Sequence, residues 1–251
     1  MKARAAPRIS VLITVAAVAL VLTASALGFW QLGRAQQKLD HQATVDRRQA
    51  LAPVSWSDAL VDMGSAPWDV LYERPVSIRG RWLPESTYFL NNRPMAGRTG
   101  FIVVSVLMPE GSAQGLLVQR GWVARQFNDL TAVPDVPLPE GWVEIKGRLT
   151  APPSKLFELG QDDMGRVRQN VDIDQLGQSL GVAMVPLSVL QSSPSGEDDN
   201  LLRAWPVIGA DVHKHYGYAF QWFGLGALTL GLYVWFQILA PRRRQAQQSS
   251  R

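Results

Sequence analysis

The sequence predicts an α+β membrane protein in which two transmembrane helices flank a β-rich, mainly antiparallel domain. Three observations predict this class: an apolar run at residues 9–30, a second at 218–239, and alternating apolar and polar side chains between them. Each run has 22 residues without a charged side chain. A helix of that length measures about 33 Å, which is enough to cross the hydrocarbon core of a bilayer.

Charge divides the chain in the same way. The tails, residues 1–8 and 240–251, hold 7 of the 25 Lys and Arg. All 21 Asp and Glu lie within residues 31–217 together with the other 18 basic residues, so this segment has a net charge of −3. Basic residues stay on the cytoplasmic side, so we expect both termini in the cytoplasm and residues 31–217 exported. The basic pI of about 9.6 therefore comes from the membrane-proximal tails, which argues against nucleic acid as a partner.

The first apolar run also fits a second interpretation. Ala24-Ser25-Ala26 resembles the small-residue site at which a signal peptide is cleaved. Because the run continues to Trp30, beyond the usual length of a signal sequence, we favour a retained anchor and leave cleavage as the alternative. The eight residues before it leave no room for a mitochondrial transit peptide, with a processed or truncated mitochondrial precursor as the alternative. We therefore expect a bacterial plasma (inner) membrane, with the central domain in the periplasm.

The exported segment begins with helix. Residues 31–49 are polar and helix-compatible, so the membrane helix is expected to continue outward as a stalk until Pro53 stops it. Ser55 with Asp58 three positions later then predicts a short capped helix ending at Gly64. The chain has no Cys, so the exported domain must be stabilised by its own hydrophobic core.

The centre of the domain has the period of β-strands. Apolar residues alternate with polar ones from Pro75 to Trp82, and further strands are predicted at 87–91, 101–108, 116–123 and 142–149. The pattern Val-x-Ile-x-Gly-Arg occurs twice, ending at Arg81 and Arg148, and its glycines predict two strands that bend to close a small barrel or curved sheet. A helix at 173–180 with Asp172 as its cap and a loop at 192–200 complete the expected elements.

Motifs for catalysis are missing from the sequence. It has no Gly-x-Ser-x-Gly, no His-Glu-x-x-His and no phosphate-binding Gly-Lys-Ser loop. Without Cys, and with its Met and His scattered, the chain also lacks the ligand clusters that bind copper or zinc. We therefore expect a protein that is not an enzyme.

Chemistry concentrates at the start of the second apolar run, in residues 213–223. On a helix, His215, Tyr218 or Ala219, and Trp222 share one face. An imidazole beside an aromatic surface of about the size of a porphyrin suits haem. Haem iron accepts an axial His in an apolar setting. The alternative interpretation is that Tyr and Trp gather at membrane interfaces regardless of function, and that the His only contacts lipid headgroups.

Four blocks in this order resemble the signatures of the surfeit locus protein 1 family, and they span nearly the whole chain. The chain departs from the family pattern at Gln119, at Ala124 and before His215. The blocks are Leu27-Gly28-Phe29-Trp30-Gln31-Leu32-Gly33-Arg34 with Lys38; Arg79-Gly80-Arg81-Trp82; Leu117-Val118-Gln119-Arg120-Gly121-Trp122-Val123; and His215-x-x-Tyr218-Ala219-x-Gln221-Trp222-Phe223.

The resemblance implies an assembly factor for cytochrome c oxidase that binds haem a and aids its insertion into subunit I, with haem a synthase and other assembly factors as further partners and membrane lipid around the helices. It places the axial ligand at His215, with Tyr218 and Trp222 lining the ring; His213 remains the alternative ligand. Arg120 or Arg34 would pair with the haem propionates. The alternative for each of them is a structural role, in a salt bridge or at a strand edge.

Two hypotheses for other classes of protein stay open. One is a scaffold that holds oxidase assembly intermediates without binding haem, because small residues give each span a face on which helices approach closely. The other is an exported sensory or ligand-binding domain with a pocket in its β-rich centre.

Overall fold

The computed structural model describes residues 10–63, 67–125, 133–157, 165–194, 199–205 and 212–243. The chain divides into two compact units: a helical unit of residues 1–43 and 207–251, and a β unit of residues 44–206. Long apolar helices in the first and a sheet in the second agree with the fold class that the sequence predicts.

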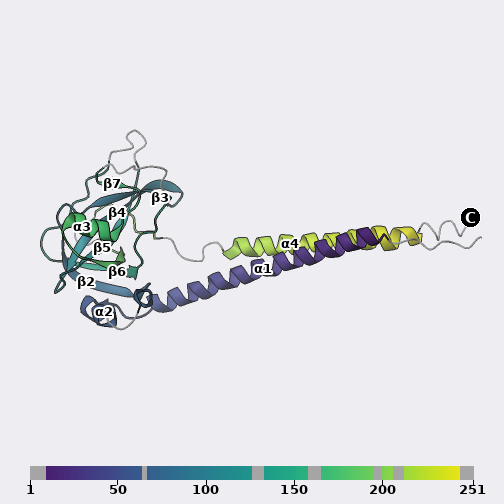
Figure 1. The fold of residues 1–251 in the computed structure, drawn as a ribbon, viewed down its shortest axis with the longest axis horizontal. Helices are drawn as coiled ribbons and strands as arrows, with labels where there is room; N and C mark the ends of the chain where they lie inside the picture. Colours follow the sequence, from purple (N-terminus) through teal and green to yellow (C-terminus); the bar gives the residue numbers. More distant parts are fainter. Residues whose placement is uncertain are drawn as a thin grey trace, which may run out of the picture. The chain divides into compact units, whose positions relative to one another are not determined.

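Two long helices form the helical unit. They are α1 (Val11–Gln49) and α4 (Val212–Tyr233), which continues as the π-helical turn η2 (Val234–Leu239) (Figure 1). Both helices are long and apolar enough to cross a membrane, as the sequence predicts. The helix of the first span runs without a break to Gln49, so the predicted stalk is confirmed as a continuation of this helix.

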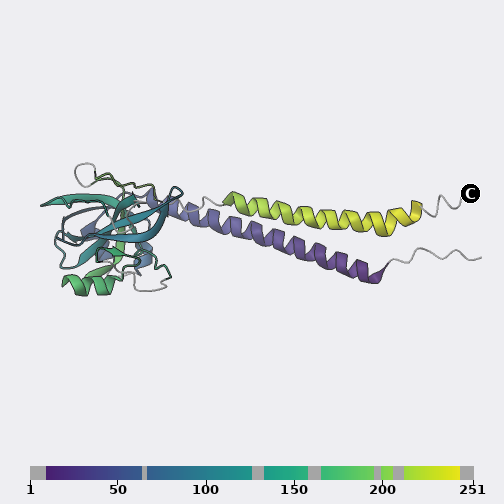
Figure 2. The ribbon, with the colours of Figure 1, turned by 90° about the horizontal axis from the view of Figure 1, so that it is seen from above.

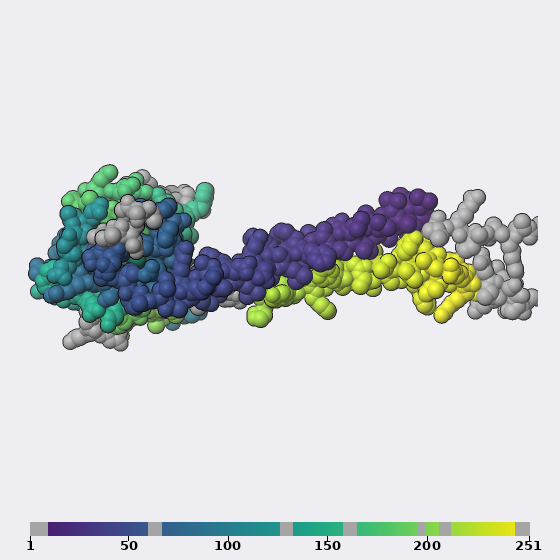
Figure 3. Space-filling model, turned by 90° about the horizontal axis from the view of Figure 1, so that it is seen from below, coloured from purple at the N-terminus to yellow at the C-terminus, as the bar shows by residue number. Residues whose placement is uncertain are grey.

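The helices α1 and α4 run side by side (Figures 2 and 3). Near one end the hydroxyls of Thr14 and Tyr233 lie 2.9 Å apart. Further along, a Cβ added to Gly226 would lie 3.6 Å from the Cβ of Ala24. The small residues of the first span therefore face the second span, where they allow close approach of the two backbones.

The β unit is an eight-stranded mixed sheet in the order β1-β2-β6-β8-β5-β4-β3-β7, and a further pairing of β2 with β4 closes a five-stranded barrel from β2, β6, β8, β5 and β4. In the described part of the unit, two short helices and a 3-10 turn accompany the strands. The elements are β1 (Val54–Ser55), α2 (Trp56–Met63), η1 (Trp68–Leu71), β2 (Pro75–Trp82), β3 (Tyr88–Met95), β4 (Arg98–Pro109), β5 (Gly115–Ala124), β6 (Val143–Thr150), β7 (Val167–Arg168), α3 (Ile173–Leu180) and β8 (Met184–Gln191).

Closure explains the single parallel pair in the barrel. Strands β2, β6 and β8 alternate in direction, as do β5, β4 and β2, but β5 and β8 are parallel. A ring with an odd number of strands cannot alternate all the way round, so one neighbouring pair must be parallel. The sequence patterns do not predict strand β8, because Pro186 within it is typical of an edge or a bulge rather than a barrel strand.

The repeated Val-x-Ile-x-Gly-Arg pattern forms the β2–β6 pair. Ile78 lies opposite Ile145, and each glycine lies opposite the first Val of the other copy. A Cβ on Gly80 would lie 2.6 Å from the carbonyl oxygen of Met108, and one on Gly147 would lie 2.3 Å from that of Leu190. The glycines therefore mark where β2 meets β4 and β6 meets β8, which confirms the predicted barrel closure.

Local signals in the β unit also hold. The Ser55 hydroxyl accepts a hydrogen bond from the amide of Asp58, as the predicted cap of α2 requires. The Asp172 carboxylate caps α3, and Gly181 ends this helix in the left-handed conformation with φ of 67°. The helix α3 lies on the outside of the barrel (Figure 2), where Leu176 packs on the apolar outer faces of β4 and β5. Of the predicted loop 192–200, residues 195–198 lie outside the described residues.

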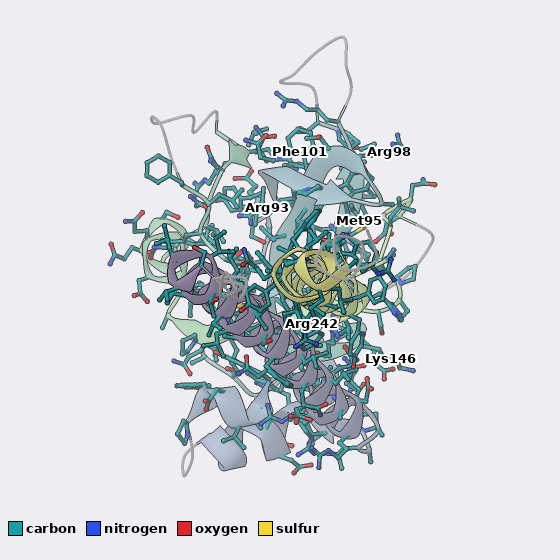
Figure 4. The ribbon with its side chains drawn as sticks, turned by 90° about the vertical axis from the view of Figure 1, so that its right-hand side faces the viewer. Arg93, Met95, Arg98, Phe101, Lys146 and Arg242 are labelled. Atoms are coloured by element: carbon teal, nitrogen blue, oxygen red, sulfur yellow. The ribbon has the colours of Figure 1, made fainter. Side chains whose placement is uncertain are left out.

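The barrel interior holds the main core, with Ile78, Leu107, Val118 and Ile145 fully buried. Strands β3 and β4 extend beyond the barrel as a hairpin whose last pair is Met95 with Arg98 (Figure 4).

Candidate functional site

The central feature of the helical unit is a hydrogen bond between its two helices. The imidazole Nδ1 of His215, on α4, lies 2.7 Å from Oε1 of Gln31, on α1. An amide oxygen can only accept, so Nδ1 carries the proton and donates it to Gln31. In the tautomer that makes this bond, the lone pair is on Nε2, the nitrogen that can bind a metal ion.

The two candidate ligands of the sequence, His213 and His215, differ in their surroundings. Side chains two residues apart on a helix point in nearly opposite directions. His215 is half-buried and bonded to α1, whereas His213 is exposed. The structure therefore gives His215 a fixed orientation, while sequence spacing alone leaves the choice between the two open.

The aromatic residues predicted around His215 separate into two groups. Trp222 is half-buried, seven residues after His215 and so on the same face of α4, while Tyr218 is 51% exposed on the flank of this face. Ala219, the alternative to Tyr218, is buried and does not offer a ring surface.

Sequence reasoning missed the contribution of α1. The rings of Phe29 and Phe223 pack edge to face with centroids 5.3 Å apart. A Cβ on Gly28 would lie 2.7 Å from two atoms of the Phe223 ring, so only glycine leaves room for this packing. Gln31 follows Gly28 by one turn, and all three α1 residues belong to the first sequence block that resembles the known family. The block thus forms the contact surface for the helix that carries His215.

Arg120 does not fit the predicted role of a propionate partner at the end of a strand. It lies within β5 at a bulge, where Val103 pairs with Gly121 and Val104 with Gln119. Its side chain is 1% exposed, donates to the carbonyl oxygen of Pro137 at 2.9 Å and lies 3.8 Å from the Asp199 carboxylate. Arg120 is therefore a structural residue of the barrel, the alternative that the sequence leaves open.

The same Asp199 also binds Arg203, whose side chain is 10% exposed, so one carboxylate serves a buried guanidinium group and a largely buried one. Burial lowers the pKa of Arg120 to about 10; Asp199 acts in the opposite direction, and the nearby Arg203 adds to the lowering. We call Arg120, Asp199 and Arg203 the buried charge cluster. Arg34, the other predicted propionate partner, is exposed on α1, and its guanidinium donates to the side chain of Gln37.

The β unit also has a cleft of about 960 Å³. Trp82, Tyr88 and the extended segment 135–141 line it. Its charged lining is balanced, so the charges favour neither an anion nor a cation; these residues are Arg81, Arg166, Arg168, Glu85, Asp135 and Glu140.

These features define the class of protein: two apolar helices suited to a membrane, a small barrel domain between them in the sequence, and one histidine held at the helix pair. The SURF1 family model matches residues 18–227 of the chain. A SURF1-like protein of Rickettsia bellii (strain RML369-C) is 23% identical over 230 residues, which cover 90% of this chain and 88% of the relative.

The chain therefore belongs to the SURF1 family, which confirms the resemblance found in its sequence blocks. Family membership implies a role in the assembly of cytochrome c oxidase.

Proposed function

We propose that this chain carries haem a at the outer rim of a bacterial plasma membrane and delivers it to subunit I of cytochrome c oxidase. The observation that carries the proposal is the 2.7 Å contact between His215 and Gln31. It orients the imidazole with Nε2 pointing away from Gln31, and no hydrogen bond joins Nε2 to any of the described residues; an axial ligand of haem iron needs such a nitrogen. The proposed role needs no catalytic group.

Several residues suit haem as a cargo. Tyr218 and Trp222 flank His215 on α4 and supply flat apolar surface for the macrocycle. Arg34 lies one turn beyond Gln31, toward the polar part of α1, and is exposed, so its guanidinium is available to a propionate. Bound haem a supplies the iron, and the chain supplies the nitrogen, the apolar surface and the cation.

The charge distribution supports the orientation that goes with this role. Both basic tails would be cytoplasmic, the β unit periplasmic, and His215 near the outer headgroup layer. Subunit I and haem a synthase are then reachable within the same membrane, where the lipid solvates the outward faces of α1 and α4.

The test is the visible spectrum and extractable haem of the detergent-purified full chain, co-produced with the enzymes that make haem a. We expect bound haem in the parent and in His213→Ala, and loss of the Soret band in His215→Ala. An unchanged spectrum in His215→Ala would remove this residue as the ligand. Loss of haem from His213→Ala alone would transfer the assignment to His213.

A second candidate is a scaffold that holds oxidase assembly intermediates without haem. It is favoured by Ala227 and Gly231, which are exposed on α4, while Ala24 and Gly28 are used for the contact between the two spans. A small-residue face thus remains available for another helix. A purified chain that co-purifies with subunit I but never contains haem, in cells that make haem a, would favour the scaffold.

The cleft in the β unit keeps the ligand-binding hypothesis testable. A sensory or substrate-binding role predicts normal oxidase activity in a strain that lacks the chain. The proposed role predicts a loss of assembled oxidase in that strain, measured by the haem a absorbance of its membranes.

A further inference from the structure

We infer that Gln31 is a positioning residue: its side-chain carbonyl fixes His215 in the tautomer with the proton on Nδ1 and aims Nε2 away from α1. This inference rests on the proposed haem site, but the contact that it concerns exists without haem. The two residues are 184 positions apart in the sequence and meet only because α1 and α4 pair.

The helix packing determines where the Gln31 side chain can reach. Gly28 admits the Phe223 ring at a distance that any side chain at position 28 would block, and Ala24 meets Gly226 further along the pair. The Phe29 ring also packs edge to face on the Phe223 ring, which adds a second contact between the helices at this level. These contacts set the register of α1 against α4, so the amide of Gln31 is placed opposite the imidazole by backbone geometry.

The hydrogen bond between Gln31 and His215 favours one of the two tautomers of the imidazole. A neutral imidazole without a partner exchanges between two tautomers, and only one of them offers Nε2 as a ligand. His215 is half-buried, so water competes only in part for its donor, and the hydrogen bond to Gln31 favours the tautomer that makes it. Gln31 therefore selects the ligating tautomer before haem arrives.

The chemistry of the acceptor also sets the strength of the ligand. A carboxylate that accepts from Nδ1 draws the proton strongly and makes the imidazole a better electron donor to the iron. An uncharged amide orients the ring with less of this effect. Gln31 thus gives an oriented ligand of moderate strength, which suits a chain that must release its haem.

The first experiment uses the haem-free full chain in detergent. The chain has three His, so a background with His41→Gln and His213→Gln leaves His215 as the only signal in ¹⁵N-histidine NMR spectra. At a pH where the spectrum shows a neutral ring, we expect a protonated Nδ1 and a bare Nε2. Gln31→Leu should shift the population toward the other tautomer, whereas Gln31→Glu, which keeps an acceptor of the same length, should retain it.

Gln36→Leu is the matched control, because Gln36 lies on the same helix, is exposed and bonds to Asp40 rather than to α4. A parent spectrum with the proton on Nε2 would overturn the inference. So would a Gln31→Leu spectrum that matches Gln36→Leu, or Leu and Glu variants with equal tautomer populations.

A structural control shows that the helices remain paired. The chain has no native Cys, and the Cβ positions of residues 24 and 226 are 3.6 Å apart, within the range of a disulfide. Ala24→Cys with Gly226→Cys should therefore cross-link in oxidised membranes, and equally so when Gln31→Leu is added. If the added Gln31→Leu abolishes the cross-link, the Leu variant no longer tests the inference, and Gln31→Glu is compared with the parent instead. A changed tautomer in Gln31→Glu overturns the inference, and a retained tautomer supports it.

The second experiment uses the haem-loaded chain. Transfer of haem to apomyoglobin should be about 10- to 100-fold faster from Gln31→Leu than from Gln36→Leu, the range found for losing a hydrogen-bond partner of a metal-bound His. Gln31→Glu should release haem more slowly and have a lower reduction potential than the parent. If His215→Ala also keeps its haem, His215 is not the ligand and the proposed haem site fails. If only Gln31→Leu behaves like its control, the positioning role alone fails.

Discussion

Gly147→Ala should open the barrel between β6 and β8. A Cβ at this position would lie 2.3 Å from the carbonyl oxygen of Leu190 and 2.7 Å from Cγ1 of Val189. Ordinary contacts are about 3.4 Å or more, so β8 would have to move by about 1 Å. The clashing atom is backbone in a closed ring of strands, which makes this movement costly.

The expected size follows from the contacts that would be strained. Gly147 pairs with Gln191 in the β6–β8 ladder, whose hydrogen bonds contribute about 1 kcal/mol each, and overpacking in a core costs about 1–3 kcal/mol. Replacing Gly restores about 0.4–1 kcal/mol, because it restricts the unfolded chain. We therefore expect the free energy of unfolding of the β unit to fall by about 2–4 kcal/mol.

The assay is urea unfolding of the full chain in detergent, followed by near-UV circular dichroism, which reports on Trp82 and Trp122 in the β unit. Lys146→Ala is the matched control, because Lys146 precedes Gly147 on β6 and its side chain is 64% exposed. The control should stay within about 0.5 kcal/mol of the parent. If Gly147→Ala loses no more than the control, the reasoning from barrel closure is refuted.

Three further predictions concern the β unit and use the same unfolding assay. Asp199→Asn leaves a buried guanidinium group and a largely buried one without their carboxylate, and should cost about 3–5 kcal/mol; a loss below about 1 kcal/mol would mean that the cluster is solvated. Trp122→Phe removes a 2.7 Å hydrogen bond from Nε1 to a buried carbonyl oxygen of β3, so it should lower the free energy of unfolding by about 1–3 kcal/mol. The control Trp142→Phe should change it little, because the Trp142 side chain is 44% exposed. The pKa of Asp172 is lowered by its hydrogen bond from Lys155, and then by the amide at the start of α3. Its contribution to stability is therefore present above the unfolded-state pKa of about 3.9 and is lost as the pH falls through the folded-state pKa; Asp172→Asn should flatten this acid limb, and an equal slope in both proteins would contradict the assignment.

Sequence reasoning finds the elements of the β unit whose signal is local. Alternation from Val76 to Trp82 identifies a strand because one face of it is buried, and the cap at Asp172 identifies α3 because a single side chain bonds to its own first turn. Gly80 and Gly147 indicate barrel closure, since a glycine inside a strand indicates close approach of another backbone. The parallel β5–β8 pair escapes such reasoning, because direction is set by the number of strands in the ring rather than by the residues of either strand.

The sequence predicts the candidate site on one helix only, for a related reason. His215 stands out because an imidazole is rare at the edge of an apolar span, and its aromatic neighbours are close in sequence. Gln31 also lies at the edge of an apolar span, but in the sequence it is simply the first residue of the polar stalk. Its meaning depends on which face of α1 meets α4, and that face is chosen by Gly28, whose lack of a side chain admits Phe223. In this chain, the sequence pattern that corresponds to the hydrogen bond across the two helices is therefore a polar residue one turn after such a glycine, together with a histidine at the edge of the other apolar span.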